Sequence, residues 1–427
     1  MTRQNYTDVA GADYGYEYDS NGLLTRRTGD GAQWSYRYDA IDRLVAATHG
    51  AETYSYQYDA LSNRLVAGQQ YDAFNKLLED RTHTYEYDAA GNLVKKINKA
   101  DNRYQAFSYN NRGRMVRFED YPAGATTPAT IAEYAHDALG RRVLKSVNGT
   151  VTRFQWQGNS IVAEYDSNNA LIKQYRYALG FAPLQYKATN GVYDVHADQL
   201  STPRAMTDQA GSNAWATNLS PYGVADITRG ESLGFNIRFP GQYADSESGL
   251  YYNRFRDYAP GTGRYVQSDL IGLRGGLNAY VYAGGNPVMY IDPTGEIGLP
   301  GAAIGGMIGG VSAFTGALAT GSSITDAVIA GSLGAAAGAA TGLFGGVGIG
   351  TSAFIGGGTN LLGQVIGNNI DKDPCNNTNI NLGAVVGSAI GGVWAAGITR
   401  GAGALSGAVI GWGPSTATGA VGTALGQ

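Results

Sequence analysis

In the first half of the chain, aromatic and polar residues alternate in short stretches of the form Tyr-x-Tyr-Asp. An alternation with a period of two predicts a β-strand with both rings on one face. Each aspartate is followed by a short run of Gly, Asn, Ala or Ser, which suits a tight turn, and then by leucine, valine and arginine, which predict a returning strand. Each unit therefore predicts a β-hairpin. The clear units begin at Tyr16, Tyr36, Tyr56 and Tyr85, and weaker ones begin at Phe107 and Tyr134.

The spacing of these units limits how they are arranged. Asp19, Asp39 and Asp59 are 20 residues apart, and the later intervals are longer and uneven. A single hairpin buries too little surface to be stable, so we expect the hairpins to stack into a longer sheet. A generic β-solenoid and a propeller are the two simple architectures, and uneven spacing disfavours a propeller with equal blades. The sequence thus predicts a mainly β fold built as a wound hairpin ribbon.

The pattern changes near residues 292–295, "DPTG". Tyrosine, arginine and aspartate dominate before this point, whereas glycine, alanine and isoleucine dominate after it. Small residues recur at intervals near four in the last part, and this spacing lets helices pack closely inside lipid. The uncharged stretch 327–370 is long enough for two membrane spans, and 382–399 is a third candidate. A glycine-rich soluble helical segment is the alternative.

Composition narrows the classes of function. The net charge is only -4, with no basic block, so we expect no nucleic-acid partner. The single cysteine, Cys375, excludes an intrachain disulfide framework, and the four histidines match no metal spacing, so we expect no metal and no cofactor. Cys375 has no histidine nearby in sequence, which disfavours an enzyme in the C-terminal segment. The first residues contain no apolar signal stretch, so export requires a dedicated machine or a larger partner.

Two longer stretches carry a family resemblance. The sequence "VHADQLSTPRAMTDQAG" (195–211) looks like the His-x-Asp-x-Leu-Gly-Thr-Pro-Arg stretch of the Rhs family, with Ser201 in the place of the glycine. Residues 239–295 resemble the Rhs-associated core almost throughout. In that family, YD repeats wind into a hollow β-shell around a C-terminal toxin, and the core plugs the shell and cuts the toxin free. The resemblance implies YD repeats in 1–180, the core in 181–295 and a variable C-terminal segment in 296–427.

One departure from the family concerns length. Related shells use many hundreds of residues, and this chain has fewer than 300 before its composition changes. Such a strip is too short to close around a cargo the size of 296–427, and an open sheet leaves unpaired edges. Either the sheet extends into a partner chain, or the chain is a displaced C-terminal portion of a longer ancestor.

The resemblance also implies a pair of catalytic aspartates. In the family, two Asp-Pro-x-Gly motifs supply the carboxylates of a self-cleaving aspartyl protease. Here they correspond to Asp269, where Leu270 replaces the proline, and to Asp292. Two neighbouring carboxylates share a proton, so one can act as a base on water and the other as an acid toward the scissile carbonyl. An ordinary β-turn is the alternative for each motif.

The residues expected to support these motifs are Gly272, Pro293, Gly295 and Arg264. Glycine allows a close backbone approach, and proline presets a turn. For Arg264, a core ion pair is a better interpretation than a catalytic group.

Two further expectations concern His196 with Asp198 and the cleaved bond. A hydrogen-bonded structural pair suits His196 and Asp198 better than a catalytic pair. We expect cleavage between Glu296 and Gly305, where the composition changes.

The sequence therefore predicts the C-terminal portion of a bacterial Rhs-type toxin-delivery protein. Its core acts once, as an aspartyl autoprotease, and releases a hydrophobic effector that disrupts a target membrane. The expected partners are an upstream Rhs shell or partner chain, an export machinery, an immunity protein and the target membrane. The expected location is secreted or at the cell surface, with the C-terminal segment inserted into the target membrane. The alternative is a non-catalytic structural or adhesive surface protein with a C-terminal helical anchor or linker.

Overall fold

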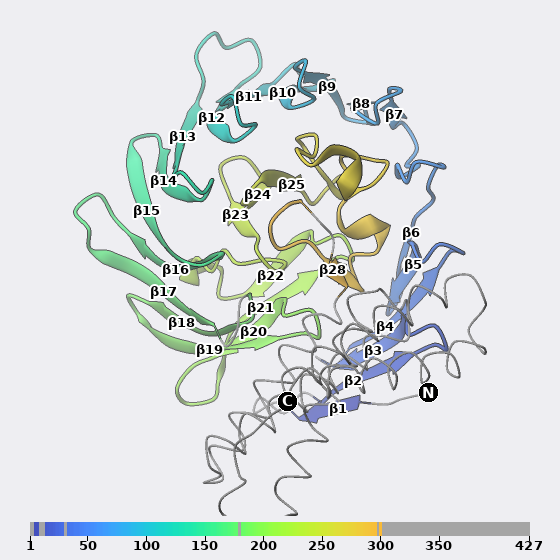
Figure 1. Ribbon diagram of the computed structural model, residues 1–427. Coiled ribbons are helices and arrows are strands. Elements are labelled where there is room, and N and C mark those ends of the chain that lie inside the picture. Colours follow the sequence, from blue (N-terminus) through green and yellow to red (C-terminus); the bar gives the residue numbers. More distant parts are fainter. Residues whose placement is uncertain (1–3, 8–12, 30–31, 178–180, 297–298, 301–427) are drawn as a thin grey trace, which may run out of the picture. The chain divides into compact units, whose positions relative to one another are not determined.

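The computed structural model describes residues 4–7, 13–29, 32–177, 181–296 and 299–300 (Figure 1). The predicted membrane spans and Cys375 lie outside these residues. The described part is almost entirely antiparallel β-structure, and its helices are single 3-10 turns, η1 (Glu231–Leu233), η2 (Gly272–Gly275) and η3 (Ala283–Gly285). The predicted mainly β fold is confirmed. Within the described residues, no helix has the length and apolar character needed to cross a membrane.

Two meandering sheets contain most of the strands, and in each sheet every strand pairs with the next one along the chain. The first, six-stranded sheet consists of β1 (Gln4–Thr7), β2 (Asp13–Tyr18), β3 (Leu24–Gly29), β4 (Ala32–Tyr38), β5 (Leu44–His49) and β6 (Glu52–Ser55). The second, 16-stranded sheet consists of β7 (Gln70–Tyr71), β8 (Leu77–Glu79), β9 (His83–Tyr87), β10 (Leu93–Asn98), β11 (Tyr104–Tyr109), β12 (Met115–Tyr121), β13 (Thr130–His136), β14 (Arg142–Val147), β15 (Thr150–Gln157), β16 (Ser160–Tyr165), β17 (Leu171–Tyr177), β18 (Pro183–Ala188), β19 (Gly191–Ala197), β20 (Pro203–Thr207), β21 (Asn213–Leu219) and β22 (Ala225–Arg229). This sheet continues across residue 180, where the repeats were expected to end.

In several repeats the aspartate closes the turn that follows its strand. At Asp59, Oδ1 accepts hydrogen bonds from the backbone N–H groups of Leu61 (2.9 Å) and Asn63 (2.8 Å). The third residue after the aspartate, Ser62, has a positive φ of 65°. A carboxylate in this position satisfies two backbone donors that the sheet cannot reach. The same arrangement occurs in the turns that start at Asp39, Asp72, Asp137, Asp166, Asp198 and Asp208.

The second tyrosine of a repeat bonds to the repeat before it. The hydroxyl of Tyr58 donates to the carbonyl oxygen of Leu44 at 2.7 Å, and Tyr109 donates to Leu93 at 2.8 Å. Leu44 pairs with Tyr38 next to a β-bulge, where the regular ladder is disrupted. The hydroxyl thus satisfies a carbonyl group at an irregular point of the sheet. Phenylalanine cannot do this, which favours tyrosine at these positions of the repeat.

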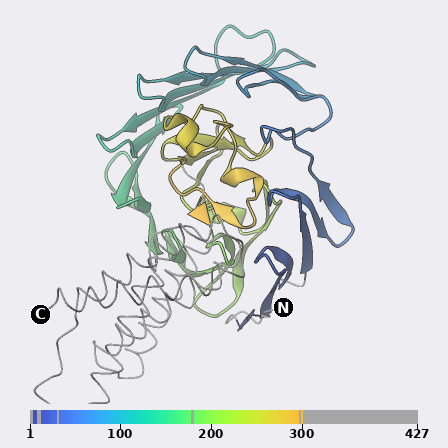
Figure 2. The same cartoon turned by 45° about the vertical axis from the view of Figure 1, so that its right-hand side comes forward.

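One face of the large sheet packs against a core segment, which we define as residues 231–296. This segment contains a four-stranded sheet of β23 (Tyr243–Asp245), β24 (Leu250–Asn253), β25 (Arg256–Ala259) and β26 (Arg264–Tyr265). It also contains β27 (Tyr290–Ile291), which pairs with β28 (Leu299–Pro300) just beyond it. Strand residues Tyr186 and Trp215 pack with Phe235 of the core segment, and farther along the sheet Phe118 lies in one cluster with Leu250. Strands β7 to β22 follow one another around this segment (Figures 1 and 2). The curved inner face of the sheet is therefore occupied by the protein's own core segment.

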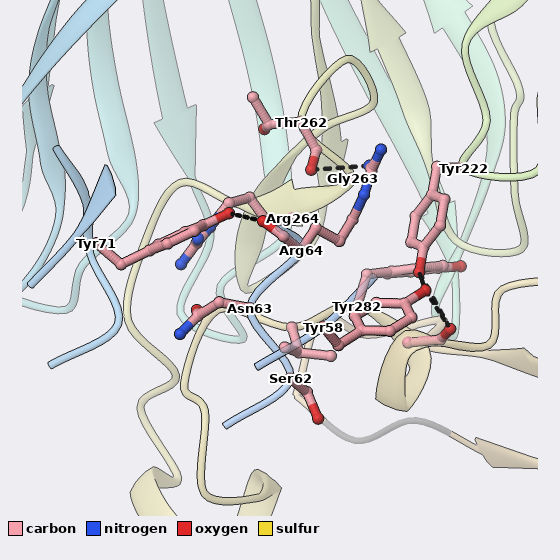
Figure 3. Close-up of a pocket in the computed structure, with 12 residues that line it drawn as sticks. Tyr58, Ser62, Asn63, Arg64, Tyr71, Tyr222, Thr262, Gly263, Arg264 and Tyr282 are labelled. Carbon is pink, nitrogen blue, oxygen red and sulfur yellow. Dashed lines mark hydrogen bonds between the residues drawn. The ribbon is translucent and has the colours of Figure 1, made fainter. Parts of the chain in front are cut away.

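The core segment also supports the break between the two sheets, near residues 56–69. The hydroxyl of Tyr58 lies 2.6 Å from that of Tyr222, which donates to the carbonyl of Gly285 at 3.0 Å (Figure 3). Arg64 Nη1 donates to the carbonyl of Thr262 at 3.0 Å. These residues line a cavity of about 20 Å³, which is room for one water molecule. Side-chain contacts with the core thus replace strand pairing at this point.

Candidate active site

The two predicted aspartates come together at a third residue, Arg256. Asp269 follows β26, Asp292 follows β27 directly, and Arg256 is the first residue of β25. Arg256 Nη2 lies 2.9 Å from Asp269 Oδ2 and 3.3 Å from Asp292 Oδ2. All three side chains are buried. One guanidinium nitrogen therefore contacts both carboxylates.

The Asp292 turn is held tightly by hydrogen bonds. Its Oδ1 accepts from the N–H groups of Gly295 (2.8 Å) and Glu296 (3.1 Å), and its Oδ2 accepts from the hydroxyl of Tyr265 (2.8 Å). Gly295 has a φ of 75°, and a Cβ at this position would lie 2.5 Å from the carbonyl oxygen of Asn253. Both the left-handed backbone and the close approach require glycine here.

Pro293, the next residue of the motif, packs against another glycine. A Cβ on Gly241 would lie 2.0 Å from the carbonyl oxygen of Pro293. This contact fixes the motif against the start of the core segment.

The Asp269 turn keeps its shape without proline. Asp269 Oδ1 accepts from the N–H of Ile271 at 3.0 Å, and the N–H of Gly272 donates to the carbonyl of Asp269 at 3.1 Å. Gly272 has a φ of 58°, so the turn closes as the repeat turns do. Leu270, in the place of the proline, is 57% exposed. Local hydrogen bonds thus orient this carboxylate although the first motif is incomplete.

The two carboxylates differ in their surroundings. Burial raises the pKa of Asp269, and the charge of Asp292 raises it further, while Arg256 and the N–H of Ile271 act in the opposite direction. Asp292 instead accepts hydrogen bonds on both of its oxygens. Burial therefore favours the protonated form of Asp269, as a proton donor requires.

The chain that leaves the Asp292 turn passes close to Asp269. Arg256 Nε donates to the carbonyl oxygen of Gly295 at 2.5 Å. A Cβ on Gly275 would lie 2.5 Å from Asp269 Oδ2 and 3.3 Å from the carbonyl oxygen of Glu296. The Asp269 carboxylate and the Glu296 carbonyl therefore border the same space, which exists because residue 275 is glycine.

Arg256 and Tyr265 were not singled out in the sequence. Arginine and tyrosine are frequent throughout the core segment, and neither residue lies in an aspartate motif. Only the pairing of β24 with β25 and of β25 with β26 brings them to Asp292.

Arg264, the arginine that was singled out, lies elsewhere. Its Nη2 donates to the carbonyl oxygen of Asn75, and its guanidinium stacks on Tyr71 and Tyr280 at 4.9 and 5.0 Å. Its described partners are thus a carbonyl and two rings, in place of the carboxylate of the expected ion pair. Arg264 attaches a repeat turn to the core segment.

His196 and Asp198 each have a partner outside the predicted pair. His196 Nε2 lies 2.9 Å from the hydroxyl of Thr207. Asp198 Oδ2 lies 2.6 Å from Arg204 Nη2 and 3.7 Å from Arg27 Nη1. Since Arg27 belongs to β3 and Arg204 to β20, Asp198 joins the two sheets.

A metal site is not evident in the part of the chain that the structure describes, where no three His, Cys, Asp or Glu side chains form a group suited to a metal ion.

Comparison with known proteins gives relatives for most of the described region. The family model of the teneurin YD-shell matches residues 2–287. Double-stranded DNA deaminase toxin A of Burkholderia cenocepacia (strain H111) is 31% identical over 255 residues, which cover 52% of this chain and 18% of the relative. Toxin protein Tse5 of Pseudomonas aeruginosa is 34% identical over 272 residues, which cover 53% of this chain and 20% of the relative.

A third relative is the probable deoxyribonuclease RhsA of Dickeya dadantii (strain 3937), which is 32% identical over 238 residues. These residues cover 53% of this chain and 16% of the relative. Among solved structures, the complex of TcdB2 and TccC3 superposes with a TM-score of 0.45 at 19% identity, over 68% of this chain and 19% of that chain. The chain spans a fifth or less of the length of the three named relatives. The match across residues 2–287, together with these relatives, places the chain in the teneurin YD-shell family as a YD-repeat protein of the Rhs type.

Proposed function

We propose that Asp269, Asp292 and Arg256 cut the chain once, at the bond after Glu296. The observation that carries this proposal is the contact of Arg256 Nη2 with both carboxylates, at 2.9 and 3.3 Å, beside the carbonyl of Glu296. Arg256 also donates to the carbonyl of Gly295, so the same side chain ties both carboxylates to the chain that leaves the turn. The bond lies at the start of the range predicted from the sequence, Glu296 to Gly305.

The geometry gives each residue a role. Asp292 accepts a proton from a water molecule, whose oxygen attacks the carbonyl carbon of Glu296. Asp269, whose pKa is raised by burial, donates its proton to the carbonyl oxygen. When the tetrahedral intermediate collapses, the C–N bond breaks, the amine of residue 297 takes up the proton held by Asp292, and one hydroxyl of the intermediate returns a proton to Asp269 as the new carboxyl group forms. Arg256 holds the two carboxylates and the Gly295 carbonyl in register, and stabilises the ionised carboxylate throughout.

The relatives support a role in toxin delivery, because toxins are among them by name. We infer that the chain is the C-terminal part of such a delivery protein, either extended by a partner chain or displaced from a longer ancestor. The division into repeats in 1–180, core in 181–295 and variable segment in 296–427 belongs to this proposal. Delivery to a target cell by an export machinery is also part of this proposal, and so is the existence of an immunity protein.

The composition of 296–427 favours an effector that acts on membranes. Its only charged residues are Glu296, Asp326, Asp371, Lys372, Asp373 and Arg400, and glycine recurs at intervals near four. Released from the core, this segment inserts into a target membrane and permeabilises it. A structural surface protein instead keeps the segment attached as an anchor.

Intact-mass measurement of the purified full-length chain tests the cleavage. The wild type is expected to give two fragments separated after residue 296, and Asp269→Asn and Asp292→Asn are expected to stay whole. Asp257→Asn, which changes a buried carboxylate outside the Arg256 contact, is the control and is expected to be cut. A wild type that remains full length, or two aspartate variants cut as fast as the wild type, contradicts the proposal.

Dye release from liposomes tests the effector. The full-length chain is expected to release dye once cleaved, and Gly305→Leu with Gly309→Leu, or Gly387→Leu with Gly391→Leu, is expected to abolish release because bulky residues block close helix packing. These changes make the segment more apolar, so weaker partitioning into lipid does not explain a loss. Asp326→Ala and Cys375→Ala are controls that should leave release unchanged.

A further inference from the structure

A buried chain of hydrogen bonds leads to the carboxylate of Asp292. The hydroxyl of Tyr265 donates to Asp292 Oδ2 at 2.8 Å, and Asn253 Nδ2 donates to the Tyr265 hydroxyl at 2.8 Å. The same amide nitrogen donates to the backbone carbonyl of Asp292 at 2.7 Å. Each of the three residues is 1% exposed or less. Asn253 is therefore bonded to Asp292 twice, once directly and once through Tyr265.

The chemistry of these groups fixes the direction of each bond. The backbone carbonyl of Asp292 can only accept, so the side-chain nitrogen of Asn253, and not its oxygen, must face it. The second N–H of this nitrogen occupies a lone pair of the Tyr265 hydroxyl, whose single proton then points at Asp292 Oδ2. Burial raises the pKa of Tyr265 well above its usual value, and the charge of Asp292 adds to this rise, although Arg256 opposes it. The hydroxyl therefore keeps its proton and remains a donor to the carboxylate.

Asn253 also has a polar atom that the fold leaves unpaired. Its Oδ1 is buried and has no hydrogen-bond partner among the described residues. An unpaired buried acceptor is unfavourable, and the two bonds that Asn253 donates offset this cost. Both of those bonds lead to Asp292.

Three neighbouring strands place these groups around one carboxylate. Asn253 is the last residue of β24, Arg256 is the first of β25, and Tyr265 is the last of β26. Asn253 pairs with Arg256, and the same strand β25 pairs with β26. The guanidinium of Arg256 stacks on the ring of Tyr265 at 3.7 Å from its centroid. Tyr265 thus contacts Arg256 through its face and Asp292 through its hydroxyl.

Charges of both signs act on the Asp292 carboxylate. The ionisable groups around it come from several elements of the described chain and include Arg256, Tyr265, Asp269, Tyr282 and Glu296. Arg256, at 3.3 Å, favours the ionised form, whereas the two acids carry the same charge and oppose it. Removing the hydroxyl of Tyr265 takes away a donor and therefore shifts the balance toward the protonated form.

We propose that Asn253 and Tyr265 hold Asp292 in its ionised form, so that Asp292 acts as the base of the site and Asp269 as the acid. This inference rests on the proposed self-cleavage. Asn253 directs the proton of Tyr265 toward Asp292 Oδ2, and that proton stabilises the negative charge that the base needs before water attacks. Both are positioning residues, because they act through Asp292.

The rate of self-cleavage as a function of pH tests this role. The full-length chain is purified in urea, and cleavage starts on dilution into buffers between about pH 4 and about pH 8. Tyr265→Phe is expected to move the acid-side fall of the rate upward by about one pH unit, so that cleavage is about tenfold slower there and within about threefold of the wild type near pH 8. A loss by the same factor at every pH, or a profile like that of the wild type, overturns the inference.

Tyr258→Phe is the matched control. Tyr258 is a buried tyrosine whose ring lies 5.9 Å from that of Tyr265, but its hydroxyl donates to the carbonyl of Tyr222 at 2.7 Å. This variant also loses a buried hydrogen bond, so any general loss of stability is shared. The position of its acid-side fall should be that of the wild type, and a shift equal to that of Tyr265→Phe contradicts the proposal.

Two variants test the place of Asn253 in the chain of bonds. Asn253→Leu and Asn253→Ala each remove both donors, and whichever refolds, as judged by circular dichroism, is expected to shift the acid-side fall in the same direction as Tyr265→Phe. Combined with Tyr265→Phe it should shift the fall no further, because Asn253 acts through the hydroxyl. An additive shift overturns this order, and failure of both variants to refold overturns the positioning role of Asn253.

Urea unfolding separates this inference from the proposed function, because it needs no cleavage. In the uncut Asp269→Asn chain, Tyr265→Phe should cost more stability at about pH 7 than at about pH 4, since its hydrogen bond is strongest to an ionised carboxylate. Adding Asp292→Asn should remove this difference. The same cost at both pH values overturns the inference even if the wild type cuts itself. An uncut wild type overturns the proposed function whatever the urea result.

Discussion

The hydroxyl of Tyr38 donates a 2.7 Å hydrogen bond to the carbonyl oxygen of Leu24, a residue 14 positions earlier and in the preceding repeat. Leu24 pairs with Tyr18 beside a bulge, so this contact serves a carbonyl group at an irregular point of the sheet. The repeats are thus joined by side chains as well as by the backbone ladder.

We expect Tyr38→Phe to lower the free energy of unfolding by about 1 kcal/mol, because a partly buried carbonyl loses its donor. Tyr58→Phe should cost more, since this hydroxyl also contacts Tyr222 and Gly285. Urea unfolding of the uncut Asp292→Asn chain measures both. Tyr54→Phe is the control, because the hydroxyl of Tyr54 bonds to the side chain of exposed Glu52 and to no carbonyl among the described residues. Equal losses in all three variants contradict the prediction.

Ser201→Gly should stabilise the protein by about 1 kcal/mol. Ser201 has a φ of 66°, is 2% exposed, and its hydroxyl has no hydrogen-bond partner among the described residues. Glycine removes both the backbone strain and the buried polar group, which outweighs the greater flexibility of the unfolded chain. Ser62→Gly is the matched control, because Ser62 has a similar φ of 65° but its hydroxyl accepts from Arg43, so its gain should be smaller. Thermal unfolding compares them, and a destabilised Ser201→Gly disproves the argument.

Arg256→Lys is expected to slow self-cleavage about 100-fold although the positive charge remains. A lysine ammonium cannot contact both carboxylates and also donate to the carbonyls of Gly295 and Ala279, as the guanidinium does. A time course of fragment appearance gives the rate. Arg141→Lys, in the surface turn at Asp137, is the control, and an Arg256→Lys rate within threefold of the wild type counts against the proposed role.

The buried carboxyl of Asp257 should make stability depend on pH. Burial raises its pKa to about 6, although Arg142 and Gln267 counteract the rise. Because the folded state then binds a proton more tightly than the unfolded state, the free energy of unfolding falls as pH rises from about 4 to about 6. Above pH 6, the ionised carboxylate of Asp257 lowers the free energy of unfolding by about 3 kcal/mol.

Asp257→Asn removes this group while keeping an acceptor for Gln267, which donates to Asp257 Oδ2 at 2.5 Å. We expect the variant to gain about 2–3 kcal/mol over the wild type between pH 4 and pH 7, measured by urea unfolding at both values. Asp226→Asn, at the surface, is the control. A constant difference between the two proteins at both pH values refutes the assignment.

Local sequence determined most of the repeat architecture. Tyr-x-Tyr alternation fixes a strand face, and Asp59 satisfies two backbone donors within four residues, so hairpin and turn both follow from short-range chemistry. The resemblance carried by 239–295 selected Asp269 and Asp292, and each turn is closed by its own aspartate and glycine. These features depend on neighbours a few residues away, which is why the sequence alone predicts them.

Only the tertiary structure decided what surrounds these features. Arg256 lies 36 positions from Asp292, and it reaches both aspartates because β25 pairs with strands that carry other parts of the site. In the sequence Arg264 looks equivalent to Arg256. It packs instead against Tyr71 and Tyr280, because its strand directs it toward a repeat turn. The inner face of the large sheet could not be assigned to the core segment from periodicity, because an apolar strand face does not specify its partner. Long-range pairing decides such contacts, and no short stretch of sequence encodes it.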